Sequence, residues 1–127
     1  MVKMSDSVFF VLELEVKPGQ IDDLRTVMRE MIDLTRLEPG TLNYEWFLSD
    51  DGASCHIYER YADSGAVLAH GAMFPANLNE RFLTFQPTRL TVYGRANQAV
   101  REAVSALAPA FLQPLGGFVR SRSEPAP

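Results

Sequence analysis

The order of apolar patterns along the sequence constrains the fold of this chain more than any other feature. Apolar and polar side chains alternate over residues 8–16, 41–48, 54–61 and 88–93, which is the period of a β-strand. Apolar side chains instead recur every three to four positions over residues 21–37 and 64–86, the period of an amphipathic helix. The resulting order, βαββαβ, predicts an α+β, ferredoxin-like fold whose antiparallel sheet carries its helices on one face.

Turn-forming and capping residues divide these patterns into elements. Residues 38–40, with the sequence Glu-Pro-Gly, end the first helix, because proline disfavours helical backbone before it and glycine tolerates the reversal. Asp63 or Ser64 is placed to cap the start of the second helix. Pro75 fits the first turn of a helix but not its interior, so the second helical segment is expected in two pieces.

The second face of the predicted sheet is rich in apolar residues. If the alternate set packs on the helices, the opposite face carries Phe9, Val11, Phe47 and Tyr58. An exposed apolar sheet surface implies a partner that covers it. We therefore expect a homodimer.

The length of 127 residues predicts a single domain followed by an extension. We expect a flexible N-terminus at residues 1–7, the ferredoxin-like domain at residues 8–94, and a frayed tail at residues 121–127.

Residues 95–120 are too apolar for a loose tail, and we expect them to dock on the dimer. Asn97 is placed to cap a helix, and the helix carries an apolar stripe of Val100, Val104 and Leu107. A short final strand is expected at residues 116–120, paired with an edge of the sheet.

Charge and cysteine content narrow the functional classes. The formal net charge is −4, and no run of Lys or Arg offers a surface for nucleic acid or for an anionic membrane. No apolar stretch approaches ~20 residues, so no membrane span is expected. The lone Cys55 has no partner for an internal disulfide, which favours a reducing compartment, the cytoplasm. Cys55 and His56 lack metal-ligand spacing, and no metal site is expected.

Three motifs resemble those of the antibiotic biosynthesis monooxygenase (ABM) family, in particular its quinol monooxygenase branch. They are Gly40-Thr41-Leu42-Asn43-Tyr44, Tyr58-Glu59-Arg60-Tyr61 and His70. The resemblance implies a dimeric α+β barrel. It also implies a monooxygenase that oxidises an electron-rich aromatic substrate, such as a quinol or a polyketide phenol, with O2. In such an enzyme His70 would be the catalytic base, and Tyr44, Trp46 and Asn77 would line the substrate site or orient the substrate.

The same resemblance bears on cofactors. The haem-degrading branch uses an asparagine on the first strand and a ligand histidine past the Phe74 position. This chain has Val11 or Leu12 on the strand and no histidine among residues 77–79, so haem is disfavoured. We expect no tightly bound cofactor, although a flavin is not excluded.

Each candidate residue also has a plain structural interpretation. His70 titrates near neutral pH, as a base should, but a histidine near a helix end also bonds to backbone. Tyr44 and Trp46, which share a face with Leu42 and Leu48, fit a core as well as a pocket wall. Glu59 lies on an apolar face, where a carboxylate is costly unless it is paired. Glu59 is either a tuned acid or base or the partner of an arginine such as Arg89 or Arg60, and we favour the structural pair.

The scaffold alone does not establish catalysis. A fold of this kind hosts unrelated functions, so function must be argued from the site. The alternative to an oxygenase is a non-catalytic or non-oxidative dimer that binds a small molecule.

Overall fold

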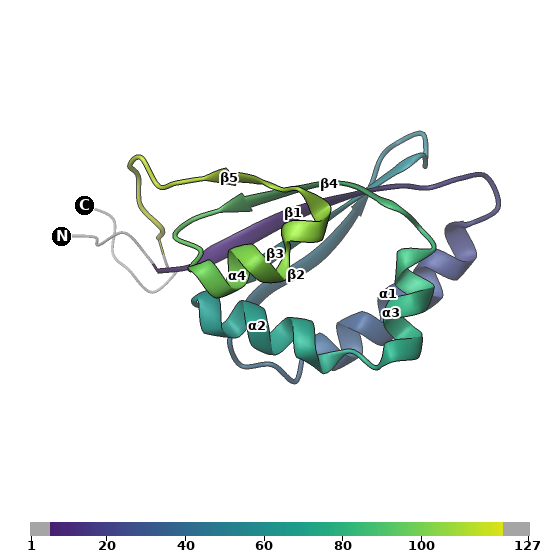
Figure 1. Cartoon of the computed structure of the whole chain (residues 1–127). Coiled ribbons are helices and arrows are strands. Elements are labelled where there is room, and N and C mark those ends of the chain that lie inside the picture. The colour runs from purple at the N-terminus through teal and green to yellow at the C-terminus, as the bar shows by residue number, and fades with distance from the viewer. Residues whose placement is uncertain (1–5, 121–127) are drawn as a thin grey trace.

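The computed structural model describes residues 6–120 (Figure 1). Its elements are β1 (Val8–Glu15), α1 (Ile21–Thr35), β2 (Thr41–Leu48), β3 (Ser54–Tyr61), α2 (Ser64–Met73), α3 (Ala76–Leu83), β4 (Pro87–Tyr93), α4 (Gln98–Ala103), a 3-10 turn (Ser105–Leu107) and β5 (Ala110–Leu112). The expected N-terminal arm and frayed tail lie, apart from residues 6 and 7, outside the described residues. Within the described part, no helix is long and apolar enough to cross a bilayer.

The sheet confirms the predicted fold class. Its strand order is β2-β3-β1-β4-β5. Strand β1 pairs antiparallel with β3 and with β4, and β2 pairs antiparallel with β3. Together with the helices between them, these four strands form the ferredoxin-like βαββαβ unit.

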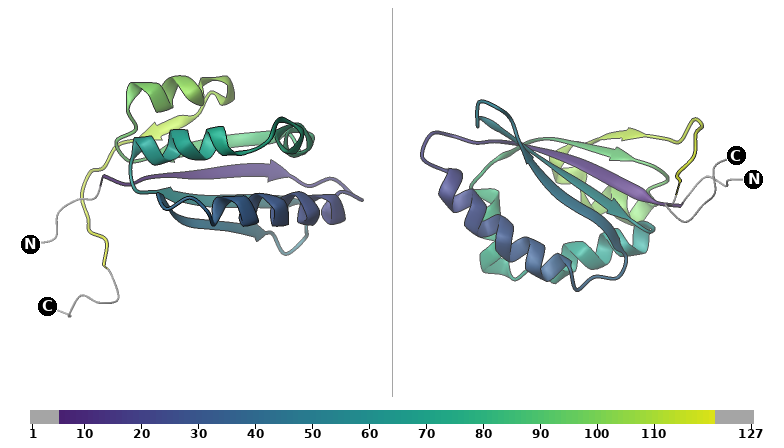
Figure 2. Two further views of the ribbon diagram at one scale, coloured as in Figure 1. Left: turned by 90° about the horizontal axis from the view of Figure 1, so that it is seen from below. Right: turned by 180° about the vertical axis from the view of Figure 1, so that it is seen from behind.

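Helices α1, α2 and α3 all cover the same face of the sheet (Figures 1 and 2). Every second residue of β1 is buried toward these helices, as the alternation predicts. The core between the two layers includes Val8, Phe10, Leu12 and Leu14 of β1, Ile57 and Tyr61 of β3, and Leu24, Val27 and Met31 of α1. The functional groups discussed below lie in this same layer.

The opposite face of the sheet is aromatic. The Phe9 ring stacks on Tyr93 at a centroid distance of 4.7 Å and lies 5.7 Å from Tyr58. The side chain of Phe47 is 53% exposed. Val11, Phe47 and Tyr58 also border a hollow of about 390 Å³. The structure therefore places the predicted apolar residues together on the face that no helix of the described chain covers.

Strand β2 departs from the predicted alternation. The pairing register with β3 shifts between Thr41 and Asn43, so Leu42 falls at an irregularity. Its side chain is 58% exposed, and that of Leu48 at the strand end is 44% exposed. Leu48, opposite the buried Cys55, shares the face of Tyr44 and Trp46 as expected, whereas the expectation that Leu42 shares this face is wrong.

The C-terminal extension contains the predicted helix and a short edge strand. Asn97 caps α4 by accepting a hydrogen bond from the backbone N–H of Val100. The expected strand at residues 116–120 is wrong, because the strand is β5, which runs parallel to β4. Since Pro109 and Pro114 cannot donate ladder hydrogen bonds, they confine the strand to the segment between them.

Candidate active site

His70 lies on the buried face of α2. The helix begins after Asp63, whose side chain accepts a hydrogen bond from the backbone N–H of Ala66, as predicted from the capping pattern. Val67 and His70 are three positions apart, so both face the sheet, and both are buried. The imidazole therefore enters the core layer rather than the solvent.

Glu38 holds one side of the His70 ring. Its carboxylate oxygens lie 3.0 and 3.1 Å from His70 Nδ1, and its side chain is almost completely buried. The Thr41 hydroxyl donates a second hydrogen bond to Glu38 Oε1 at 3.2 Å. Glu38 is not among the residues predicted for the site, since nothing in the local pattern distinguishes a buried turn carboxylate from a solvated one.

Gly40 allows the turn that carries Glu38 to approach α2. A Cβ atom at Gly40 would lie 2.7 Å from Ala66 Cβ, a distance that real Cβ atoms do not tolerate. The close approach brings Glu38 within reach of His70, which lies one helical turn beyond Ala66.

We expect Gly40→Ala to lower the free energy of unfolding by about 1–3 kcal/mol, because two backbone segments must separate to fit the methyl group. Gly71→Ala is the matched control. Gly71 lies within α2 with no atom within 4 Å of an added Cβ, so this change should stabilise by up to about 1 kcal/mol. Urea unfolding measures both, and a neutral Gly40→Ala would contradict the close approach.

Glu59 faces the other nitrogen of His70. It lies between Ile57 and Tyr61 on the buried face of β3. Its Oε1 accepts a 2.5 Å hydrogen bond from the Tyr61 hydroxyl and lies 3.4 Å from His70 Nε2.

The expectation of an arginine partner for Glu59 is wrong. Arg60 points to the other face of the strand and donates to the Ser7 hydroxyl, while Arg89 lies 3.7 Å from Glu13. Alternation on β3 separates Glu59 from Arg60, and the pairing of β1 with β4 places Arg89 beside Glu13.

The electrostatics of this cluster favour a charged histidine. Burial alone would lower the pKa of His70, but the hydrogen bonds and charges of Glu59 and Glu38 outweigh it and raise the pKa above its ordinary value of 6.5. Burial, followed by the charge of Glu59, raises the pKa of Tyr61 far above its ordinary value. Tyr61 therefore remains a neutral donor to Glu59.

Aromatic rings enclose His70. The ring centroids of Phe74, Tyr61 and Tyr44 lie 4.8, 5.3 and 5.4 Å from that of the imidazole. Trp46 is one step farther away, 6.1 Å from the Tyr44 ring. Of the residues predicted for the site, the structure thus brings Tyr44 against His70 and places Trp46 behind Tyr44.

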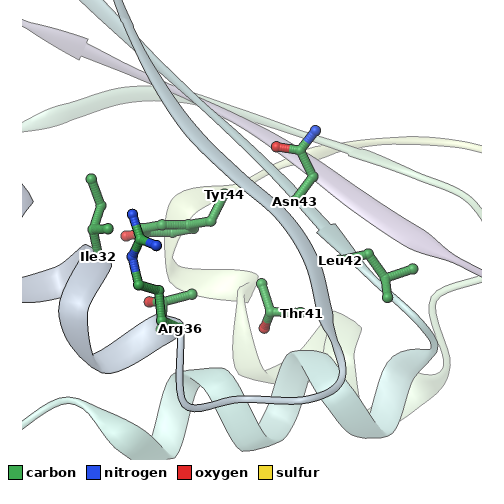
Figure 3. Close-up of a pocket in the computed structure, with 7 residues that line it drawn as sticks. Ile32, Arg36, Thr41, Leu42, Asn43 and Tyr44 are labelled. Atoms are coloured by element: carbon green, nitrogen blue, oxygen red, sulfur yellow. The ribbon is translucent and has the colours of Figure 1, made fainter.

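Tyr44 connects the histidine to a pocket of about 190 Å³ between the end of α1 and the start of β2 (Figure 3). Thr35, Arg36 and Tyr44 line this pocket together with Ile32 and residues 41–43. Burial, then the charge of Glu59, raises the pKa of Tyr44 well above its ordinary value. The Thr35 hydroxyl and the Trp46 indole N–H lie close enough to offset part of this rise, yet neither completes a hydrogen bond.

The structure does not bring Asn77 to this cluster. Asn77 is exposed on α3 and lines a separate hollow between α1 and α3 with Glu30 and Arg81. Cys55 is buried in the core, where burial raises the pKa of its thiol to about 11, whereas His56 lies on the other face, 3.4 Å from Glu13. Among residues 6–120, no three His, Cys, Asp or Glu side chains are arranged to hold a metal ion.

Solved structures share this fold. MupZ from Pseudomonas fluorescens aligns with a TM-score of 0.81 at 21% identity, over 96% of this chain and 100% of its own. Rv0793 from Mycobacterium tuberculosis aligns with a TM-score of 0.58 at 24% identity, over 73% of this chain and 98% of its own. A candidate antibiotic biosynthesis monooxygenase from Caulobacter crescentus CB15 aligns with a TM-score of 0.59 at 18% identity, over 69% of this chain and 86% of its own. At these identities the likeness establishes the fold.

Sequence comparison identifies the family. No protein of curated function matches the chain significantly. The family model described as antibiotic biosynthesis monooxygenase matches residues 7–73, more than half of the chain. This segment contains Glu38, Tyr44, Glu59 and His70, the residues that meet in the buried cluster. The chain therefore belongs to the antibiotic biosynthesis monooxygenase family.

Proposed function

We propose that this protein is an oxygenase that oxidises an electron-rich aromatic substrate, a quinol or a polyketide phenol, with O2 and without a tightly bound cofactor. The observation that carries the proposal is the His70 imidazole, held by Glu38 through Nδ1 and enclosed by aromatic rings. A base oriented by a carboxylate in an apolar enclosure suits proton removal from a phenol.

His70 is the base in this proposal. In the neutral imidazole the Nδ1–H donates to Glu38, which leaves the lone pair on Nε2 to accept the phenolic proton. Glu38 then stabilises the imidazolium, and Glu59 beside Nε2 increases the basicity of the ring. Activity should therefore rise with pH through a pKa above 6.5, since the neutral form is the active one.

The oxidation itself proceeds on the substrate. The phenolate passes one electron to O2, and the resulting radical pair combines to form a carbon–oxygen bond in a hydroperoxide. The His70 imidazolium returns the phenolic proton to the peroxide oxygen. Loss of water then leaves one oxygen atom on the ring as a carbonyl, while the other departs with that proton and the single hydrogen of the same ring carbon. The aromatic enclosure around His70 protects these intermediates from solvent.

Two measurements on the purified protein test the proposal. An absorption spectrum without visible bands, together with O2 uptake on addition of reduced menadione above the rate of the quinol alone, is the expected result. Bands of a haem or flavin would contradict the cofactor-free chemistry. Absence of uptake across a panel of quinols and phenols would contradict the oxygenase.

The second candidate function is a small-molecule-binding dimer without oxidative activity. It is favoured by one observation, that both ring nitrogens of His70 face carboxylates, with Nε2 3.4 Å from Glu59. Such an ion pair stabilises a protonated histidine that has no catalytic task. Saturable binding of an aromatic ligand without O2 uptake would distinguish this function.

We also propose that the protein works as a homodimer joined through the aromatic sheet face. Light scattering at micromolar concentration should give about twice the chain mass, because the face around Phe9 and Phe47 exposes apolar surface that a second copy would cover. Phe47→Asp should lower that mass. Leu83→Asp is the control, since Leu83 is at least as exposed as Phe47 but lies on α3. A monomeric wild-type protein would contradict the proposal.

A further inference from the structure

The pocket beyond Tyr44 has a chemical character that the proposed function does not use. We infer that it binds an anionic oxygen group, a carboxylate in the simplest case, on the aromatic substrate, with Arg36 and Thr35 as the binding residues. The inference rests on the proposed function for the identity of the site. It adds the substrate class and a residue that determines specificity.

Arg36 supplies the positive charge. It is the C-cap residue of α1, and its guanidinium points into the pocket that Tyr44 also enters from β2 (Figure 3). Within residues 6–120 the structure records no ion pair for this side chain. A guanidinium presents a planar fork of N–H donors that matches the two oxygens of a carboxylate.

Thr35 supplies an independent observation at the same place. The residue is only 3% exposed, and its hydroxyl oxygen has no hydrogen-bond partner. A buried polar group without a partner costs free energy, which a ligand that accepts its hydrogen bond would recover. Thr35 and Arg36 both line this pocket, so an anionic group bound in it lies beside both residues.

The remaining wall of the pocket sets the orientation of the ligand. Tyr44 offers its ring to the pocket and touches His70 on its other side. Asn43 points away from Arg36 across the strand, so it does not join the binding set (Figure 3). An anionic group held at Arg36 thus fixes one end of the ligand, and the aromatic part of the ligand packs on Tyr44, the ring that lies between the pocket and His70.

The size of the pocket agrees with this orientation. Sites that enclose a complete drug-sized ligand measure roughly 300–1,000 Å³. The pocket measures about 190 Å³, enough for one substituted ring. It therefore holds only one end of a larger substrate.

Calorimetric titration with two matched probes tests the inference. The probes are 6-hydroxy-2-naphthoate, which carries a carboxylate opposite its hydroxyl group, and 2-naphthol, which lacks the carboxylate. We expect the acid to bind more tightly. Arg36→Gln should weaken binding of the acid about tenfold, the effect of losing a partly solvated charge-assisted contact, and should change 2-naphthol binding much less.

Arg29→Gln is the matched control, because Arg29 is also an exposed arginine on α1 but does not line the pocket. It should leave the affinity for the acid unchanged. Equal affinities for the two probes, equal losses in the two variants, or no binding of the acid at millimolar concentration would overturn the inference. The titration needs no turnover, so absence of O2 uptake would contradict the proposed oxygenase and leave this result intact.

Discussion

His70→Ala is expected to lower O2 uptake with a quinol substrate by about 10²–10⁴-fold, the range for loss of a general base. The imidazole is the one buried group of the cluster whose ordinary pKa lies near neutrality, and Glu38 fixes its orientation. Its loss also leaves Glu38 and Glu59 as buried carboxylates without their shared cation. The effect is measured by comparing the steady-state rate of O2 uptake of the folded variant with that of the wild-type protein.

His56→Ala is the matched control for this experiment. His56 lies on the opposite sheet face, half exposed beside Glu13, so its loss should change the rate little. Circular dichroism verifies that His70→Ala retains its fold. Equal rates for the two variants would show that His70 is not the base, whatever the activity of the wild-type protein.

Truncation after Gly94 is expected to reduce the free energy of unfolding by about 3–6 kcal/mol, a large fraction of the total for a small domain. The removed segment contains Val100, which is completely buried, and Val104 and Phe111, which pack against the core. It also contains β5, so its loss leaves the backbone of β4 unpaired along one edge. Urea unfolding at a fixed protein concentration measures the change.

Two single substitutions test whether the buried side chains of the extension, rather than its length alone, stabilise the domain. Val100→Ala should destabilise by roughly 1–3 kcal/mol, because it leaves a cavity in the core. Val119→Ala changes the same side chain at a position that is 46% exposed and should be close to neutral. Equal effects of these two substitutions, or a truncated chain of full stability, would show that the extension does not support the domain.

Local patterns were enough to predict most of the fold. The alternation in β1 and β3 assigned their buried faces correctly, and Asp63 and Asn97 cap the helices as their residue types suggest. These features depend on neighbours within a few positions, which the sequence displays directly. The irregularity at Leu42 and the position of β5 depend on pairing with distant strands, and local patterns do not display such pairing.

The candidate site was predicted only in part for the same reason. The family resemblance singled out Tyr44 and His70, which the structure brings into contact. The pairing of His70 with Glu38 joins residues that are 32 positions apart, and it depends on the approach that Gly40 permits. Glu59 stood out as a carboxylate on an apolar strand face, but its partner, His70, lies on α2 in the helical layer, and the local pattern of β3 does not display this contact.

Transfer of oxygen from O2 to an aromatic substrate distinguishes the proposed oxygenase from a binding protein. Incubation with a quinol or phenol substrate under oxygen-18 gas, followed by mass spectrometry of the product, tests it most directly. We expect a product that carries one atom of the heavy isotope, formed by the wild-type protein and largely lost in His70→Ala. A product free of the isotope, or an equal yield with and without the protein, would contradict it.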